Sequence, residues 1–583
     1  MKNFESPIKN LLLLLFLTGA SNCAVNPRCP TALLPVVEVQ VNNSASTHDD
    51  YISTGAFTSC RARITNFNNF NGNPNFPGGV EVEFRNRRLS TDLIISPVNA
   101  GVTSSFFSTL PANGGWFSFF IKGNLLSAVD KSAILELATA GVTCNEVSLT
   151  RTGLMVGTPP IPSNRPQLEI EVGSISRLDD YLTWAPTTCR VKWINPPNNA
   201  ATLGITLRNM PVGNRLRFAN TQPAAGTTAT NATTTLTLSG SGAWVNFYMA
   251  GNFNNASVND KDAVLEILET SSSDLLAREG VMVRIRKNAN SLTTGERDRY
   301  LEALRETHQT YNFYILFRNS HSQDGIADAQ AHGGSAFLPW HRLFVLHLER
   351  LLQGSDPSIA LPYWHFDQTA SGLFNPDFLG AKSAGQWVTL SATNPISSWQ
   401  IPGEIVGIRR RTDFANNGIP GVATELSTLG LSANYSGFKS MEGNPHGSAH
   451  NASASATSWI GGLPTAPQDP LFFFLHCNVD RLWAKWQWSN NRFDPLQNNT
   501  YDLQGSFTTP ATPGFILGQY VDDTVWPWDN VTGGTALAQR PGYAPLTPFP
   551  IALGGLFPGS QPNIRSTIDY RIINFIYDDI FPF

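Results

Sequence analysis

Short runs of alternating apolar and polar residues fill the first half of the chain. Examples are VEVEF from residue 80, LEIEV from residue 168 and WVNFYM from residue 244. Gly, Asn, Pro and Ser separate the runs, and no long stretch of helical period interrupts them. A period of two is typical of strands with one buried face, so this half of the chain is predicted to form antiparallel β-sandwiches.

The alternating region contains the same pattern twice. DDYISTGAFTSCRARI begins at Asp49 and DDYLTWAPTTCRVKW at Asp179, with Cys60 and Cys189 at matching places. Three further markers recur in the same order about 130 residues apart: WFSFFIKGN and WVNFYMAGN, SAILEL and DAVLEI, GLMV and GVMV. This order predicts a duplicated all-β module, with one copy at residues 35–158 and the other at 166–287. Neither copy has a cluster of catalytic residue types, which favours a spacer, docking or covering role.

The pattern changes at SLTTGERDRYLEALRETH, which begins at Ser291. SLTTGE is a helix-capping signal, and Tyr300, Leu301 and Leu304 follow at helical spacing. From residue 290 to 583 we therefore expect a mainly α-helical core, a helix bundle with long loops. Residues 370–435, rich in Gly, Ser, Asn and Thr, are predicted to form a long loop layer beside a functional site.

The N-terminus has the pattern of a secretory signal. Lys2 and Lys9 precede an apolar run that is too short to span a bilayer, and small residues follow it. We expect residues 1–24 to be a signal peptide and the protein to be secreted or periplasmic. Cys23 is an alternative lipidation site, although Asn22 before it does not fit a lipoprotein signal. No later segment is a transmembrane candidate.

The charge balance narrows the partners. The formal net charge is -4, the isoelectric point is about 6.2, and no Lys/Arg cluster of the kind that binds nucleic acid is present. A nucleic-acid partner is therefore not expected, and a small neutral substrate is the simpler expectation.

Three of the ten histidines lie in AHGGSAFLPWHRLFVLHLER, residues 331–350. Pro339 favours the start of a helix, so His341 lies in the first turn and can point into a core. His332 lies in the preceding Gly-Gly-Ser loop and can fold back over the start of that helix. His347 is six residues beyond His341, about 600° around the helix axis, and is interpreted as a surface or packing histidine.

A second histidine group lies further along. MEGNPHGSAHNASAS places His446 and His450 at i and i+4, and DPLFFFLHCNVDRLWAKWQW adds His476. Imidazole ligands suit zinc, copper, iron and nickel, but the Glu-x-x-His pattern of di-iron bundles and the HExxH helix of zinc proteases are both absent. Two all-histidine sites suit copper, which can exchange two electrons with dioxygen.

At these residues the chain resembles the tyrosinase family, the type 3 copper proteins that include tyrosinases, catechol oxidases and hemocyanins. HGGSAFLPWHRLFVLHLE and DPLFFFLHCNVD resemble the two copper signatures of the family. LPYWHFD, VDRLWAKWQ and the C-terminal STIDYRIINFIYDDIFPF resemble other family segments. The resemblance covers about residues 290–583 and implies two copper ions, dioxygen and a small phenolic substrate.

The resemblance implies three histidines for each copper ion. The motifs place six residues in these roles: His321, His332 and His341 for the first copper; His446, His450 and His476 for the second. The first ligand of the first copper has two candidates. The family places it at the end of a helix before a loop, where YNFYILFRNSH puts His321, while the alternative, His308 in LRETHQ, belongs to the preceding helix.

The resemblance also suggests residues around the copper ions. Glu442 resembles the acidic residue that positions a water near the second copper, but a helix-capping or solvated glutamate is an equal alternative. Gly447 lies where many efficient monophenol hydroxylases carry asparagine. Ala331 precedes His332 with no cysteine nearby, so the cysteine–histidine thioether of many plant and fungal members is not expected.

Four further residues have expected supporting roles. Leu463 corresponds to the gate residue over the copper pocket, and Phe472 is expected to brace the imidazoles. Arg342 and Asp480, each next to or one turn from a ligand, are expected to form a charged pair that joins the two halves of the site.

The sequence thus predicts a type 3 copper oxidoreductase that oxidises o-diphenols to o-quinones with dioxygen and also hydroxylates monophenols. Two alternatives remain: a hemocyanin-like oxygen-binding protein, and an adhesion or matrix protein with a vestigial copper site.

Overall fold

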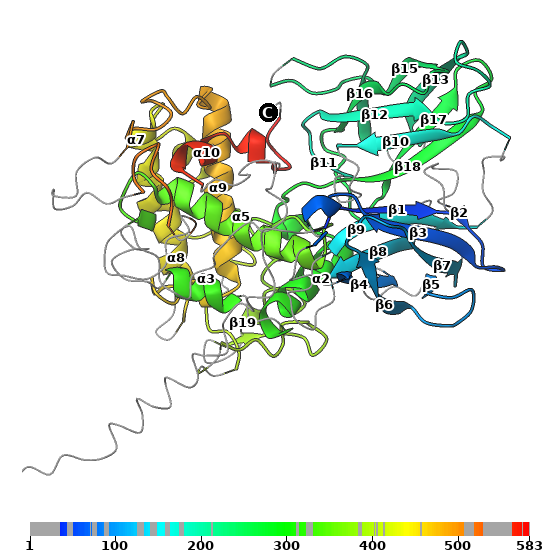
Figure 1. Cartoon of the computed structure of the whole chain (residues 1–583). Helices are drawn as coiled ribbons and strands as arrows, with labels where there is room; N and C mark the ends of the chain where they lie inside the picture. The colour runs from blue at the N-terminus through cyan, green and yellow to red at the C-terminus, as the bar shows by residue number, and fades with distance from the viewer. Residues whose placement is uncertain are drawn as a thin grey trace, which may run out of the picture.

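The computed structural model of the chain (Figure 1) describes residues 35–581 except for single positions and short segments. The longer segments that it does not describe are 43–50, 73–77, 87–91, 125–132, 140–147, 158–163, 174–179, 322–329, 383–386, 507–517 and 529–561. The predicted signal peptide and Cys23 lie outside the described residues.

Two sheets form the first β unit. The four-stranded sheet has the order β1 (Val37–Val41), β3 (Thr58–Ile64), β7 (Phe117–Gly123), β5 (Leu93–Ser96). The five-stranded sheet has the order β2 (Tyr51–Ile52), β9 (Ser148–Val156), β8 (Ala133–Thr139), β4 (Gly79–Asn86), β6 (Ser105–Pro111). Apolar residues at alternate positions point between the sheets, and the polar residues between them face outward.

The second β unit repeats this strand order. Its four-stranded sheet runs β10 (Leu168–Val172), β12 (Thr187–Trp193), β16 (Val245–Gly251), β14 (Leu216–Ala219). Its five-stranded sheet runs β11 (Tyr181–Leu182), β18 (Leu275–Val283), β17 (Ala263–Glu269), β13 (Thr202–Asn209), β15 (Thr233–Ser239). Registers also correspond, since Val41 lies opposite Cys60 in one unit and Val172 opposite Cys189 in the other.

Helices dominate only parts of the chain after residue 290. Among the described residues, four helices have eight residues or more: α2 (Thr294–Arg305), α3 (Tyr314–His321), α5 (Phe337–Ser355) and α9 (Leu471–Asn490). The short α-helices are α6 (Glu425–Leu429), α7 (Tyr435–Phe438), α8 (Ser448–Ser453) and α10 (Ile564–Ile568). Single-turn 3-10 and π elements are η3 (Phe67–Asn69), η4 (Ala289–Ser291), η5 (Glu306–Thr310), η6 (Lys439–Glu442), η7 (Gly443–Gly447), η8 (Ala466–Gln468) and η9 (Tyr570–Ile573).

The predicted fold class was wrong in two respects. The copper region is only partly helical, because the described residues between α5 and α6 form turns and one two-stranded sheet, β19 (Ala381–Lys382) and β20 (Val388–Thr389). Gly, Asn, Ser and Pro in this stretch disfavour helix. The β units are half-barrel sheets rather than purely antiparallel sandwiches, and β2 and β11 pair in parallel with β9 and β18. Alternation in sequence does not encode strand direction.

The second β unit and the copper region share one hydrophobic core, whereas the first β unit has a separate one. Trp184 of the second unit donates its indole N–H to the Tyr577 carbonyl, at 3.1 Å, near the C-terminus. Phe253 stacks on Phe581, with ring centroids 4.6 Å apart. In Figure 1 the β units lie to one side of the helices. Among the described residues no helix is both long and apolar enough to cross a bilayer.

Candidate metal centre

The two longest helices, α5 and α9, bring the two histidine groups together. His341 lies in the first turns of α5 and His476 in those of α9, and both are buried. Their imidazole rings are stacked, with centroids 4.1 Å apart and planes 12° apart. α5 begins at Phe337, two residues before the expected start at Pro339, which proline tolerates in a first turn.

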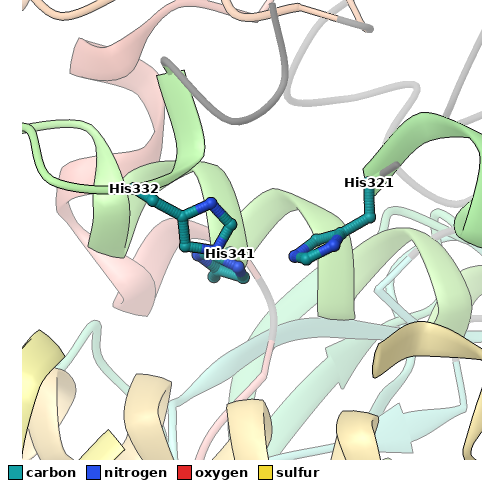
Figure 2. Close-up of side chains that lie close together, drawn as sticks. All are labelled: His321, His332 and His341. Carbon is teal, nitrogen blue, oxygen red and sulfur yellow. The ribbon is translucent and has the colours of Figure 1, made fainter. Parts of the chain in front are cut away.

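Three histidines from separate elements form the first triad. His321 ends α3, His332 lies in the loop before α5, and His341 lies in α5 (Figure 2). One ring nitrogen of each lies within 4.8 Å of the others. The His321 Nδ1 is 2.8 Å from the Leu463 carbonyl oxygen, and the His341 Nδ1 is 2.9 Å from the Phe337 carbonyl oxygen.

The second triad comes from η7, α8 and α9. The His446 Nε2 and the His450 Nε2 lie 3.3 Å and 3.2 Å from the His476 Nε2. Their Nδ1 atoms face carbonyl oxygens, that of Glu442 at 2.8 Å and that of Ile460 at 2.7 Å. The i, i+4 spacing thus places two imidazoles on one side, as the sequence predicted.

The tautomers of these rings favour a metal ion. A carbonyl oxygen only accepts hydrogen bonds, so the Nδ1 of His446 and of His450 must carry the proton, which leaves a lone pair on each Nε2. Both lone pairs point at the His476 Nε2, which has at most one proton to donate. In the first triad, the buried Nε2 atoms of His321 and His341 have no hydrogen-bond partner among the described residues.

The spacing also fits a metal. An ion bonded tetrahedrally to imidazole nitrogens at about 2.0–2.1 Å separates those nitrogens by about 3.3–3.4 Å. In the second triad, the His476 Nε2 lies at nearly this spacing from the Nε2 atoms of His446 and His450. Anchoring of the second ring nitrogen by a carbonyl is also typical of metal-bound histidine.

Burial keeps the imidazoles neutral. It lowers the pKa of His321, His341, His446 and His476 well below the ordinary value, and that of His450 to about 4. Neighbouring imidazoles lower the pKa further, because a second positive charge in the cluster would be repelled. Neutral imidazole is the metal-binding form, so the site is ready to coordinate at neutral pH.

Two of the remaining histidines, His308 and His347, bear on the predicted ligand set. The His308 Nε2 is 2.7 Å from the Gln400 carbonyl oxygen, and its ring lies 4.2 Å from that of Trp399. His347 is buried against Phe317 rather than at the surface, with ring centroids 4.9 Å apart. The structure therefore brings His321, and not His308, to the first triad.

The predicted surrounding residues lie close to the triads. The Phe472 ring is 4.2 Å from that of His476 and 5.1 Å from that of His321, centroid to centroid. Leu463 is 41% exposed, and its carbonyl holds His321. Gly447 follows His446, and a side chain there would begin 3.3 Å from the Glu442 carbonyl oxygen.

Glu442 links His446 of the second triad to the loop that carries His332 of the first. Its backbone carbonyl holds His446, and its carboxylate Oε1 accepts a 2.7 Å hydrogen bond from the backbone N–H of Gly333, next to His332. The half-buried carboxylate therefore fixes the loop of the first triad from the side of the second.

A buried charge network lies behind the two long helices. Arg342 Nε lies 2.5 Å from Asp480 Oδ1, and both side chains are buried. The sequence reasoning missed two partners, Arg286 and Glu349, which join the same network. Glu349 lies two helical turns after Arg342 on the same face, a signal that was available. Arg286 lies outside the motifs and has no such signal.

Two adjacent three-histidine sites, with four of the six imidazoles buried, define a binuclear metal protein. Comparison with known proteins identifies the metal. A family model described as the common central domain of tyrosinase matches residues 301–489. Tyrosinase from Streptomyces antibioticus is 31% identical over 281 residues, which cover 43% of this chain and 96% of the relative. Tyrosinase from Streptomyces glaucescens is 34% identical over 286 residues, which cover 44% of this chain and 97% of the relative.

Among solved structures, a functional unit from octopus hemocyanin matches with 18% identity and a TM-score of 0.35, covering 51% of this chain and 68% of that one. By its sequence similarity to the Streptomyces tyrosinases, the chain belongs to the tyrosinase family of type 3 copper proteins, and its cofactor is a pair of copper ions. The predicted family and cofactor are confirmed.

Proposed function

We propose that the protein is a phenol oxidase that oxidises o-diphenols to o-quinones with dioxygen and also hydroxylates monophenols. The observation that carries the proposal is the pair of complete triads in contact through His341 and His476. A pair of copper ions held there would supply the two-electron chemistry with dioxygen. Two diphenol molecules each lose two electrons and two protons, and one dioxygen becomes two water molecules.

Access to the triads favours turnover over oxygen transport. His332 of the first triad and His450 of the second are only partly buried, while the other four ligands are buried. One histidine of each triad is therefore partly exposed, and we propose that the phenol enters beside these two residues. A phenol entering by this route would pass Leu463, whose exposed side chain suits contact with an aromatic ring.

Phe472 and Glu442 are proposed to serve the same reaction. The Phe472 ring packs edge-on or tilted against imidazoles of both triads and holds their planes. The Glu442 carbonyl holds His446 and its carboxylate binds the Gly333 N–H, and we propose that Glu442 positions the loop of His332 and assists deprotonation of the phenol. Gly447 supplies no side chain for that step, so we propose that diphenol oxidation exceeds monophenol hydroxylation.

The N-terminal half has its own proposed roles. We propose that residues 35–158 and 166–287 are duplicated modules, supported by the matching strand orders, and that 290–583 is the copper domain. We also propose that residues 1–24 direct secretion. The core shared by the second β unit and the copper region supports a structural role for that unit.

The test is an assay of the copper-loaded protein with catechol and with L-tyrosine, following oxygen consumption and quinone absorbance. We expect steady turnover of catechol, slower turnover of tyrosine, and none with His341→Ala. Reversible oxygen uptake without turnover would instead identify an oxygen carrier. An unchanged biological role in His341→Ala would favour an adhesion or matrix protein.

A further inference from the structure

The loop that carries His332 has little regular structure of its own. The segment that holds it runs from Gln330 to Ala336: Gln330 and Ala331 end a helix, residues 332–336 form bends and turns, and α5 begins at Phe337. Gly333 adopts a left-handed conformation, with φ of 69°. A ligand on such a loop is held in place only as well as the loop is held, so the contacts of its backbone decide the position of the His332 imidazole.

One side chain from far along the chain spans both ends of this loop. The Gln519 Oε1 accepts a hydrogen bond from the Ala336 backbone N–H at 2.8 Å, and the Gln519 Nε2 donates one to the Gln330 carbonyl at 3.0 Å. Gln519 is itself buried, with 8% of its surface exposed. The Gln519 side-chain amide therefore bridges the two ends of this seven-residue segment.

The chemistry and the packing at this point both require the amide. The two ends of the loop present one donor and one acceptor, and among side chains of this length only glutamine offers both in one planar group. Gly334 lies against the same amide: a Cβ atom there would be 2.4 Å from Gln519 Oε1. Glycine at position 334 therefore leaves the space that the Gln519 side chain occupies.

The support continues behind Gln519. The buried Tyr501 hydroxyl donates a hydrogen bond to the backbone carbonyl of Gln519 at 2.5 Å. The Gln330 side chain accepts from the Trp526 backbone N–H at 3.0 Å. Buried hydrogen bonds therefore hold both the Gln519 backbone and the Gln330 side chain in place. A water molecule cannot replace them as it could replace a surface contact.

We propose that Gln519 is a positioning residue for the first copper site, holding His332 in place through the two ends of its loop. The second triad makes no use of this loop for a ligand, so Gln519 affects the two copper ions unequally. The inference rests on copper binding and not on the phenol oxidase activity proposed above.

The test compares Gln519→Met with the wild type and with Gln504→Met. Methionine keeps the length and removes both hydrogen bonds. The control, Gln504, is half-buried, and within the described part of the chain its amide donates to the backbone carbonyls of Pro495 and Tyr501 and to no other group. Each purified, copper-loaded protein is titrated with a copper chelator, and bound copper is counted. Electron paramagnetic resonance detects isolated Cu(II), which a coupled copper pair does not give.

We expect Gln519→Met to lose one copper per chain at a chelator concentration about 10–100 times below that needed for the wild type, the usual effect of removing a group that supports a ligand. The second copper should stay bound and give the isolated Cu(II) signal. We expect the same signal from His332→Ala, which removes the ligand itself. Gln504→Met keeps both ions. Retention of both ions by Gln519→Met, or equal loss of both, would overturn the proposal.

A second variant covers the case in which Gln519→Met does not fold. Gln519→Asn keeps the amide but is one methylene shorter, so it cannot reach both the Ala336 N–H and the Gln330 carbonyl. We expect the same preferential loss of one copper from this variant, and wild-type affinity for both ions would overturn the proposal. Because these readouts need no substrate, an inactive protein that still loses one copper would reject the proposed activity and keep the inference.

Discussion

Arg286 and Asp480 form a buried ion pair, with Arg286 Nη1 3.0 Å from Asp480 Oδ2. Arg286 follows the last strand of the second β unit, and Asp480 lies one turn after His476 on α9. Arg286 also binds Glu349 on α5, with Nη2 2.7 Å from Oε2, and Asp480 also binds Arg342, the neighbour of His341. The residues that link the β region to the copper helices therefore lie directly behind the metal ligands.

Replacing Arg286 with methionine should strongly destabilise the protein. Asp480 and Glu349 would keep buried charges with too few partners, and breaking a buried pair on one side costs about 3–5 kcal/mol. Equilibrium urea unfolding of the copper-free protein measures the change. Arg297→Met is the control, since Arg297 pairs with the half-exposed Asp298 and should cost less than about 1 kcal/mol. Equal effects of the two variants would contradict the prediction.

The sequence predicted the part of this network that lies next to motifs. Arg342 and Asp480 were found because each adjoins a histidine that the signatures identify. Arg286 lies 194 residues from Asp480, and no periodicity connects residues on different elements. Gln519 was missed for the same reason, since its partners lie 183 and 189 residues away. Local patterns specify elements and ligands, whereas contacts between distant segments follow only from the folded chain.

The first β unit has its own link to α5 through Arg151. Its Nη1 lies 2.8 Å from Asp260 of the second β unit and 3.0 Å from Asp356 at the end of α5, and its Nε lies 3.1 Å from Glu136. Burial opposes ionisation of Asp356, but the Arg151 guanidinium outweighs burial and holds the Asp356 pKa well below its usual range.

This link predicts a pH-dependent effect of Arg151→Met. A depressed carboxyl pKa contributes stability that is fully present above the unfolded pKa of about 3.9 and is lost as the pH falls toward the folded value. The copper-free variant should therefore be about 3–5 kcal/mol less stable than the wild type at pH 6, with a smaller gap at pH 3.

Urea unfolding at the two pH values checks this prediction. Arg190→Met in the second β unit is the control: its pair with Glu171 is partly exposed and should change stability by less than about 1 kcal/mol. A gap between Arg151→Met and wild type that stays constant from pH 6 to pH 3 would argue against the role of Asp356.

His321 and His308 should differ in copper binding. His321 directs an unpartnered Nε2 into the first triad, whereas the Nε2 of His308 faces a carbonyl and its ring packs on Trp399. His321→Ala should therefore bind one copper per chain and His308→Ala two, with His308→Ala losing some stability from its cavity. Elemental analysis of the purified proteins measures the ratio. One copper in His308→Ala would reverse the assignment.

The limits of the sequence also show in the fold. Helices were predicted correctly where an apolar stripe accompanies a histidine, as at α5 and α9, but this pattern was extended too far across the copper region. Apart from β19 and β20, the described residues between 356 and 424 form turns and irregular backbone, because Gly, Pro and Asn prefer turns. Their apolar residues, such as Trp364 and Trp399, pack into the core from irregular backbone. Burial without periodicity cannot be recognised in one sequence.

Glu442 has two proposed roles, which the variants Glu442→Gln and Glu442→Ala distinguish. Its Oε1 accepts from the Gly333 N–H, and an amide oxygen can accept the same bond. Glu442→Gln should therefore keep both copper ions, while Glu442→Ala loses the bond and weakens the first site. If the carboxylate also takes a proton from the phenol, Glu442→Gln should lower kcat about 10²–10⁴-fold with copper content unchanged. Copper analysis and steady-state kinetics on catechol measure the two effects separately, and unchanged kcat in Glu442→Gln would restrict Glu442 to holding the His332 loop.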